Sequence, residues 1–129
     1  MMNFKKTVGK LITLSLFPLT MTACSGESAI SYSQDVRPII DQNCMECHQP
    51  GGNGEIASGF NMSNYDGLMK GTRNGPMVIA GDVEGSNLLV LIEGRADPSI
   101  TMPHGQQKSV SEEDIDTIRL WIKQGAKNN

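Results

Sequence analysis

Two cysteines and a histidine stand close together in the segment 43–48, which reads NCMECH. Thiolate sulfur and imidazole nitrogen are zinc ligands, and two neighbouring thiols can also form a redox-active dithiol. The same cysteine spacing, with a histidine directly after the second cysteine, is also the attachment signature of a c-type haem. The segment therefore has three chemical interpretations, and other parts of the chain must separate them.

The chain lacks the partners that a zinc site or a thioredoxin-like dithiol requires. A structural zinc ion commonly takes its ligands from two cysteine pairs, or from one pair and two histidines. The chain has no second Cys-X-X-Cys pair, and its two histidines are His48 and His104. Because His48 adjoins Cys47, joint binding of one ion by both is strained. A dithiol of the thioredoxin type would require a βαβ pattern, which is missing, and would leave His48 unexplained.

Attachment of haem accounts for all three residues of the motif. Residues three apart on a helical turn lie on one face, so the thiols of Cys44 and Cys47 can form thioethers with the two vinyl groups along one edge of a protoporphyrin. His48 would then bind the iron from the proximal side. We therefore expect one covalently attached haem c, with Cys44 and Cys47 as its attachment points and His48 as an axial ligand.

The beginning of the chain has the pattern of a secretory signal. Basic residues precede an apolar run from Leu11 to Met21, which is shorter than the roughly 20 residues of a transmembrane helix. Small residues then lead into Cys24, and this arrangement resembles the lipobox of bacterial lipoproteins. The resemblance implies that residues 1–23 are removed and that Cys24 becomes lipid-modified. The alternative is an ordinary cleaved signal beside an incidental cysteine. Export agrees with a c-type haem, which bacteria attach outside the cytoplasm.

The remaining chain, residues 24–129, has the size of one domain. It carries 8 Lys and Arg against 14 Asp and Glu, and such an acidic surface argues against nucleic acid as a partner. Its aromatic residues are few, and the segment 49–59 is mostly glycine and polar residues. A domain with so little apolar mass needs a staple or a cofactor to fill its centre, which a haem would provide.

The hydrophobic pattern predicts an all-α fold of three to four short helices joined by long loops. Apolar residues recur at helical spacing from Val36 to Cys44, and a short helix is expected over residues 62–70. The apolar run 87–92, which Ser86 can cap, fits a helix or a buried strand, although no matching strands occur. Glycine and proline predict a loop after His48.

The last predicted element has the clearest signals. Ser111 and the acids after it resemble a capping box, Ile118 and Trp121 belong to one apolar stripe, and Gly125 stands where a helix C-cap is expected. The predicted organisation is a tether at residues 24–32 and a single domain at residues 33–127.

Several segments, taken in order, resemble monohaem cytochromes c, and most closely the planctomycete-type cytochrome c domain. These are DVRPII at 35–40, NCMECH at 43–48, GDVEGS at 81–86, MPHG at 102–105, SEEDI at 111–115 and LWIKQGA at 120–126. The resemblance implies a cytochrome c-like fold wrapped around one haem, with the first and last helices crossing beside it. The chain differs from the usual pattern at His104, where such domains often have a second proline.

The second axial ligand must come from the opposite face of the haem, and hence from a distant part of the chain. Met102 lies in an irregular loop before the last helix, where Pro103 favours an extended backbone, and the resemblance also assigns the ligand to this position. His104 and Met77 remain alternatives because histidine and methionine are the usual sixth ligands. An open sixth position is a further alternative. Met45 lies inside the attachment segment and cannot reach across the ring.

Ligation by His48 and Met102 would leave no position on the iron for a substrate. The expected function is therefore transfer of single electrons between redox proteins, without enzymatic activity. A haem-based sensor or small-ligand module would need a displaceable sixth ligand. A haem-free structural lipoprotein would need unmodified Cys44 and Cys47.

The expected location is the cell envelope. Two or more acyl chains at Cys24 would anchor the protein stably to a membrane, on the periplasmic side, and its partners would be redox proteins near that membrane. Ser25 stands where enteric lipoproteins retained at the inner membrane have an aspartate, which favours the outer membrane.

Overall fold

The computed structural model describes residues 27–105 and 108–129, and these form a helical domain. The expected signal sequence and Cys24 lie outside the described residues. The elements in chain order are the π-helical segment η1 (Tyr32–Val36) and the helices α1 (Arg37–Asn43), α2 (Met45–His48), α3 (Asn53–Ser58), α4 (Tyr65–Lys70), α5 (Asn87–Ile92) and α6 (Glu112–Lys123). Within the described ranges there is no β-strand, only two isolated β-bridges, so the all-α prediction is confirmed. These ranges contain six α-helices rather than the three or four expected, because α2 and α3 form in and directly after the cysteine motif. None of the helices in these ranges has the length and apolar character of a membrane span.

The chain enters the fold through two fused helical segments. The hydroxyl of Ser31 caps η1 by accepting a hydrogen bond from the Gln34 backbone N–H at 3.3 Å. Pro38 occupies the first turn of α1, directly after η1, where its fixed φ suits a helical backbone. The proline is therefore compatible with the helix predicted from Val36 onward.

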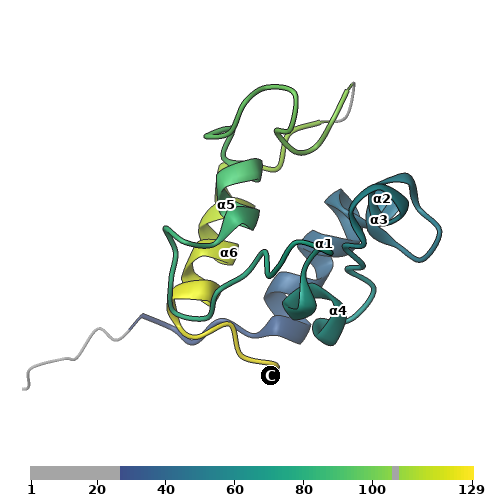
Figure 1. The fold of residues 1–129 in the computed structure, drawn as a ribbon. Coiled ribbons are helices and arrows are strands. Elements are labelled where there is room, and N and C mark those ends of the chain that lie inside the picture. The colour runs from purple at the N-terminus through teal and green to yellow at the C-terminus, as the bar shows by residue number, and fades with distance from the viewer. Residues whose placement is uncertain (1–26, 106–107) are drawn as a thin grey trace, which may run out of the picture.

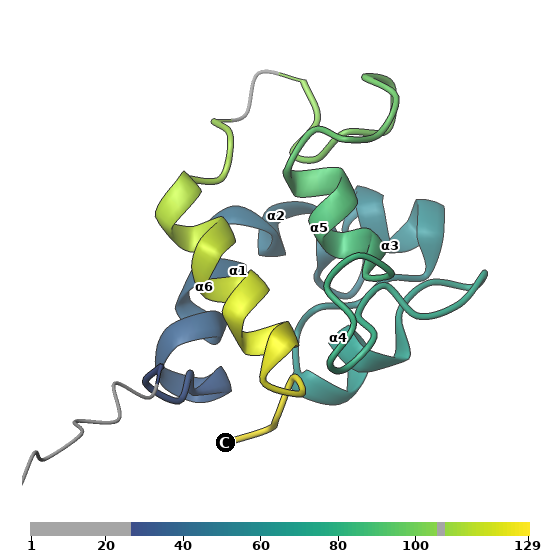
Figure 2. The ribbon, with the colours of Figure 1, turned by 90° about the vertical axis from the view of Figure 1, so that its left-hand side faces the viewer.

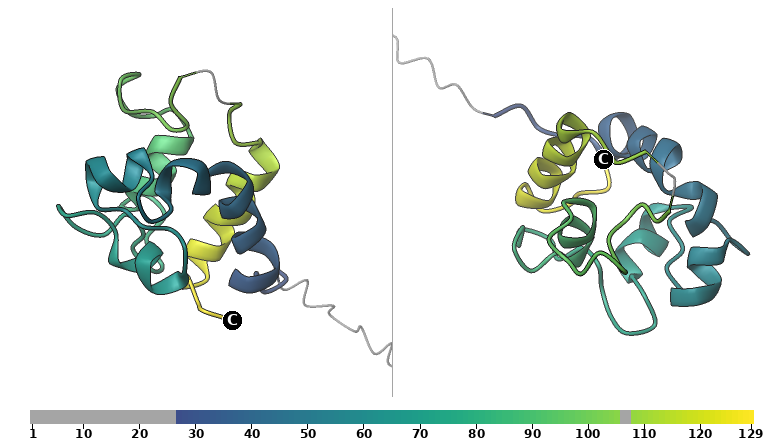
Figure 3. Two further views of the ribbon diagram at one scale, coloured as in Figure 1. Left: turned by 90° about the vertical axis from the view of Figure 1, so that its right-hand side faces the viewer. Right: turned by 90° about the horizontal axis from the view of Figure 1, so that it is seen from above.

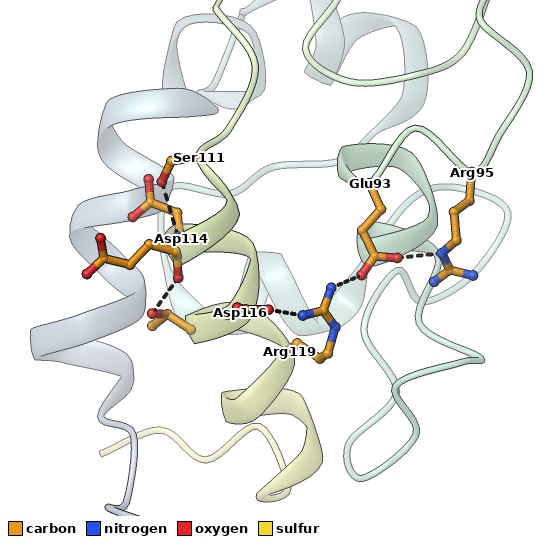
Figure 4. Close-up of polar contacts among 8 residues, drawn as sticks. Glu93, Arg95, Ser111, Asp114, Asp116 and Arg119 are labelled. Carbon is orange, nitrogen blue, oxygen red and sulfur yellow. Dashed lines mark hydrogen bonds and ion pairs between the residues drawn. The ribbon is translucent and has the colours of Figure 1, made fainter.

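The last helix, α6, is built as its sequence predicts. The Ser111 hydroxyl accepts a hydrogen bond from the Asp114 backbone N–H at 3.2 Å (Figure 4), and the helix is followed by Gly125, whose φ of 99° lies in the region that favours glycine. One face of α6 is buried and packs against η1, and the rings of Trp121 and Tyr32 lie 5.7 Å apart. Figure 3 shows this crossing of the first and last helical segments.

Helix α5 resolves the ambiguity of the apolar run 87–92 in favour of a helix. Leu88, Leu89 and Ile92 are buried, and the helix packs against α6 (Figure 2). Ser86 stands at its N-cap, but the hydroxyl does not cap the helix as expected. It is buried and instead donates to the Asp82 carbonyl at 2.6 Å, because the preceding turn places that carbonyl within its reach.

The segment 49–59 is where the fold departs most from the pattern of its sequence. Glycine and proline predict a loop there, yet α3 forms over Asn53–Ser58. The helix packs against α2, and the Met62 N–H donates to the His48 carbonyl at 2.8 Å. Tertiary contacts thus override a weak local helix propensity.

Candidate functional site

The motif cysteines lie at the junction of α1 and α2. Cys44 closes α1, with its N–H donating to the Ile40 carbonyl at 2.9 Å, and its own carbonyl accepts from the His48 N–H at 3.0 Å. Both thiols are free and half-buried. The helical turn expected from the motif spacing is therefore present, and Cys47 and His48 both belong to it.

His48 is held in one orientation by the backbone of a neighbouring loop. Its ring is 9% exposed, and Nδ1 lies 2.9 Å from the carbonyl oxygen of Phe60. A carbonyl can only accept, so Nδ1–H is the donor of this bond, and Nε2 is the ring nitrogen left to face a metal. Metal-binding histidines characteristically donate their other ring nitrogen in this way. The Phe60 ring, at 5.3 Å, adds an edge-on contact.

Gly54 of α3 packs directly against the same imidazole. A Cβ atom at this position would lie 2.9 Å from both Cε1 and Nε2 of His48, and 3.0 Å from the carbonyl oxygen of Cys47. These distances are too short for ordinary contact, so only glycine allows α3 to approach the ring this closely.

A cleft of about 440 Å³ opens in front of these residues. This volume lies within the range of cofactor pockets in proteins, and the exposed surface of the cleft is mostly apolar. One wall comes from the motif and α3 and contains Cys44, Cys47, His48, Gly54, Ala57 and Ser58. The other side comes from α5 and the loop before α6 and contains Leu88, Leu91, Ile92, Met102, Pro103 and His104. Figure 1 shows the two groups of elements facing each other.

The structure brings all the candidate iron ligands to this one cleft. Met102, His104 and Met77 line it together with His48. Met62 also lines it and is almost fully buried, at 2% exposure. Met45 is partly buried and packs against the core. The lipidation site, Cys24, lies outside the described residues.

The loop that carries Met102 is fixed at its base. The Met102 N–H donates to the Leu91 carbonyl at 3.1 Å, in the last turn of α5. Just beyond that turn, the carboxylate of Glu93 forms ion pairs with Arg119 of α6, at 2.6 Å, and with Arg95 (Figure 4). Burial raises the pKa of Glu93, but the hydrogen bonds and charges of the two guanidinium groups outweigh burial and hold this pKa below its usual value. The carboxylate is therefore charged at neutral pH and links the end of α5 to the middle of α6.

The environment of the cysteines argues against a redox dithiol. Burial, with a smaller contribution from the charge of Asp41, raises the pKa of the Cys44 thiol to about 12. Reactive dithiols have a lowered thiol pKa, because the thiolate is the nucleophile. In the described ranges there is also no group of three or more His, Cys, Asp or Glu side chains that could hold a metal ion, which disfavours a zinc site in this part of the chain.

Comparison with known proteins agrees with this geometry. Residues 44–106 match the family model described as planctomycete cytochrome C. The chain carries a cytochrome c-like domain. No curated protein and no solved structure matches the chain. Proteins with this domain contain haem c, and the cysteine spacing of the chain is that of the haem attachment motif.

The residues of the cytochrome domain fit a haem. The cleft offers two thiols and an imidazole nitrogen on one wall, a thioether on the other, and apolar side chains between them. Two of the contacts that prepare the site could not be identified from side-chain chemistry. The Phe60 carbonyl acts through the backbone, and Gly54 acts by having no side chain. The sequence does place a glycine close to the motif, but the composition of its segment predicts a loop and so does not indicate contact with His48.

Proposed function

We propose that this protein is a membrane-anchored, extracytoplasmic cytochrome c that carries single electrons between redox partners. The observation that supports this most directly is the cleft, which brings Cys44, Cys47 and His48 to one side and Met102 to the other. Haem c would supply the ferric–ferrous couple. The protein side chains would supply its attachment, its orientation and a medium of low polarity.

Each residue of the site has a defined task in this proposal. Cys44 and Cys47 would hold the porphyrin edge through thioethers. His48 would bind the iron through Nε2, while its Nδ1–H, donated to the Phe60 carbonyl, fixes the ring and would increase the basicity of the ligand. Met102 is the proposed sixth ligand. A thioether in this position raises the reduction potential, and the apolar side chains around it keep water away.

The anchoring and location follow from the N-terminal sequence. Cys24 would carry the acyl chains, and the protein would face the periplasm, with the outer membrane favoured by Ser25. Its partners would be redox proteins near that membrane, and no enzymatic reaction is assigned to it.

A haem-based sensor is the second candidate, and one observation favours it. Met102 and Pro103 line not only the haem cleft but also a separate surface cavity of about 650 Å³, next to Glu93 and Arg119. The Met102 segment therefore borders two cavities, and its movement would free the sixth position for a small ligand.

Absorption spectra of the mature protein distinguish the two functions. The protein is purified from a host that matures c-type cytochromes, and spectra are recorded in both oxidation states, with carbon monoxide added to the ferrous form. An electron carrier with a closed site shows the long-wavelength sulfur-to-iron band in the ferric form and no response to carbon monoxide. Haem without that band, together with carbon monoxide binding, would support the sensor. Absence of covalent haem would refute both.

A further inference from the structure

The residues just before η1 are held on the surface of the domain. The Ile30 N–H donates to Gln124 Oε1 at 2.8 Å, and Gln124 Nε2 donates to the Ser28 carbonyl at 3.0 Å. Glu27 forms an exposed ion pair with Lys123 at 3.1 Å. Residues 27–31, called the docked segment below, therefore follow the C-terminal end of α6.

Asn129 holds the same segment from the other side. Its Oδ1 accepts from the Tyr32 N–H at 2.9 Å, and its Nδ2 donates to the Ile30 carbonyl at 3.3 Å. The Asn129 carbonyl accepts from the Ser31 hydroxyl and the Ser33 N–H, both at 2.9 Å. The docked segment is thus bonded to two residues that follow α6, through both side chains and backbone.

Docking shortens the part of the chain that can act as a tether. Counted from the sequence alone, a tether from Cys24 to Tyr32 has eight residues that could span at most roughly 27 Å. With residues 27–31 docked, only Ser25 and Gly26 stand between Cys24 and Glu27. This connection spans at most about 10 Å at 3.3–3.6 Å per residue. A lipid on Cys24 would therefore stay close to the docked segment.

The haem cleft lies toward the other end of the domain. Gln124, which holds the docked segment, follows α6, whereas Val110, which lines the cleft, precedes it. The 12 residues of α6 separate these two ends by about 18 Å. Figures 1 and 2 agree, since the docked segment and the C-terminal residues lie at the bottom and the loop between α5 and α6, which carries Met102, lies at the top.

We propose that the docked segment holds the domain upright on the membrane, with the Met102 loop and the haem cleft directed toward the aqueous phase. The redox partner is then a protein that approaches from the aqueous side, and not a quinol dissolved in the bilayer. This inference rests on the proposed function and on lipidation of Cys24. The charge of residues 24–129 supports it, because 14 Asp and Glu against 8 Lys and Arg oppose a domain that lies flat on anionic lipids.

Two matched positions report the orientation of the domain. Lys127 and Lys108 are both exposed and lie after and before α6, respectively. Lys127→Cys and Lys108→Cys are each labelled with a nitroxide in the lipidated, haem-loaded protein, in which the native cysteines would all be thioethers. Accessibility to lipid-dissolved oxygen and to an aqueous nickel chelate is then measured on vesicles. We expect the label at 127 to lie at the lipid surface and the label at 108 to be exposed to the aqueous reagent only.

The cause of the orientation is tested by releasing the docked segment. The double substitution Gln124→Ala and Asn129→Ala removes the four side-chain hydrogen bonds to residues 28, 30 and 32. In a second variant, a Gly/Ser spacer of about ten residues after Gly26 lengthens the connection between Cys24 and the docked segment to roughly 18 Å. Both changes should abolish the difference between positions 127 and 108. Thr117→Ala, elsewhere on α6, is the control and should preserve it.

The outcomes separate this inference from the proposed function. Equal lipid exposure of both positions in the unaltered protein, or a difference that survives the double substitution and the spacer, would overturn the upright orientation. A haem-loaded protein that stays in the aqueous phase would also overturn it, while leaving the electron carrier intact. An anchored protein without covalent haem would refute the proposed function, and the absorption spectrum separates this outcome from a failed orientation in the haem-loaded protein.

Discussion

Gly54 offers the sharpest test of the site, because a single added methyl group should act on His48. In Gly54→Ala, the new Cβ would lie 2.9 Å from Cε1 and Nε2 of the imidazole and 3.0 Å from the Cys47 carbonyl oxygen. The carbonyl belongs to the α2 backbone and cannot easily move. The ring must therefore turn or shift, and it is held by the hydrogen bond to the Phe60 carbonyl. The methyl group should disturb this bond and the Nε2 atom that would bind iron.

Two effects of opposite sign determine the stability of this variant. Alanine is favoured over glycine in a helix by at most about 1 kcal/mol. Overpacking costs about 1–3 kcal/mol, and loss of the His48 hydrogen bond adds about 1 kcal/mol. The clash therefore wins, and we expect a net loss of roughly 1–3 kcal/mol in the free energy of unfolding. Altered support of a metal-bound histidine should also weaken ligation by about 10–100-fold.

The assay combines denaturant unfolding with the spectrum of the haem-loaded variant. Weakened His48 ligation should produce a high-spin fraction, and imidazole added to the solution should bind more readily than to the unaltered protein. Ile56→Ala, on the same helix but 61% exposed and outside the cleft lining, is the matched control and should leave the spectrum unchanged. If Gly54→Ala were stabilised by about 1 kcal/mol with an unaltered spectrum, the contact between α3 and the ring would have no functional importance.

Three further substitutions test other parts of the site. Met102→Ala should leave haem attached, remove the sulfur-to-iron band and allow carbon monoxide to bind; an unchanged spectrum would show that another residue is the ligand. Joint replacement of Cys44 and Cys47 by alanine should abolish covalent haem, measured by pyridine haemochrome assay, and most of the fold, measured by circular dichroism. A stable haem-free protein would contradict the cofactor's role in the core. Glu93→Gln should lower the free energy of unfolding by about 1 kcal/mol at neutral pH. This is the contribution of a charge-assisted hydrogen bond, reduced by the partial exposure of Arg119. The pKa of Glu93 is lower in the folded protein than in the unfolded chain. The stabilisation from the Glu93 carboxylate is therefore complete above the ordinary glutamate pKa and is lost as the pH falls through the pKa of the folded protein. The denaturant unfolding curves of the unaltered protein and of Glu93→Gln should therefore converge in acid.

The attachment side of the site could be predicted from the sequence because its chemistry is local. Cys44, Cys47 and His48 occupy one helical turn, and the turn itself fixes their relation. The signals around α6 are also local, since Ser111 and Gly125 each act on the nearest turn of the helix. Such features depend on the backbone near one residue and need no knowledge of the tertiary fold.

The rest of the site depends on contacts between distant segments, which local patterns do not contain. The sequence predicts a loop where α3 forms, because glycine lowers helix propensity and only packing against α2 compensates for it. Likewise, residues 27–31 have the composition of a free tether, and their docking depends on Gln124 and Asn129, nearly a hundred residues away. In both places the deciding contacts are made with another segment of the chain, which a local pattern does not record.

Of the two candidate axial ligands, His48 is held more firmly than Met102, and this difference determines which ligand should exchange more easily. His48 is fixed by the Phe60 carbonyl, by the close approach of Gly54 and by its own helical turn. Met102 is partly buried against the core and is held by a backbone hydrogen bond to Leu91, in a loop that also borders a second cavity. Segments with few buried contacts open at the lowest free-energy cost. Any exchange of ligand should therefore occur on the Met102 side, and weakening the Glu93 ion pairs should promote it while leaving His48 in place.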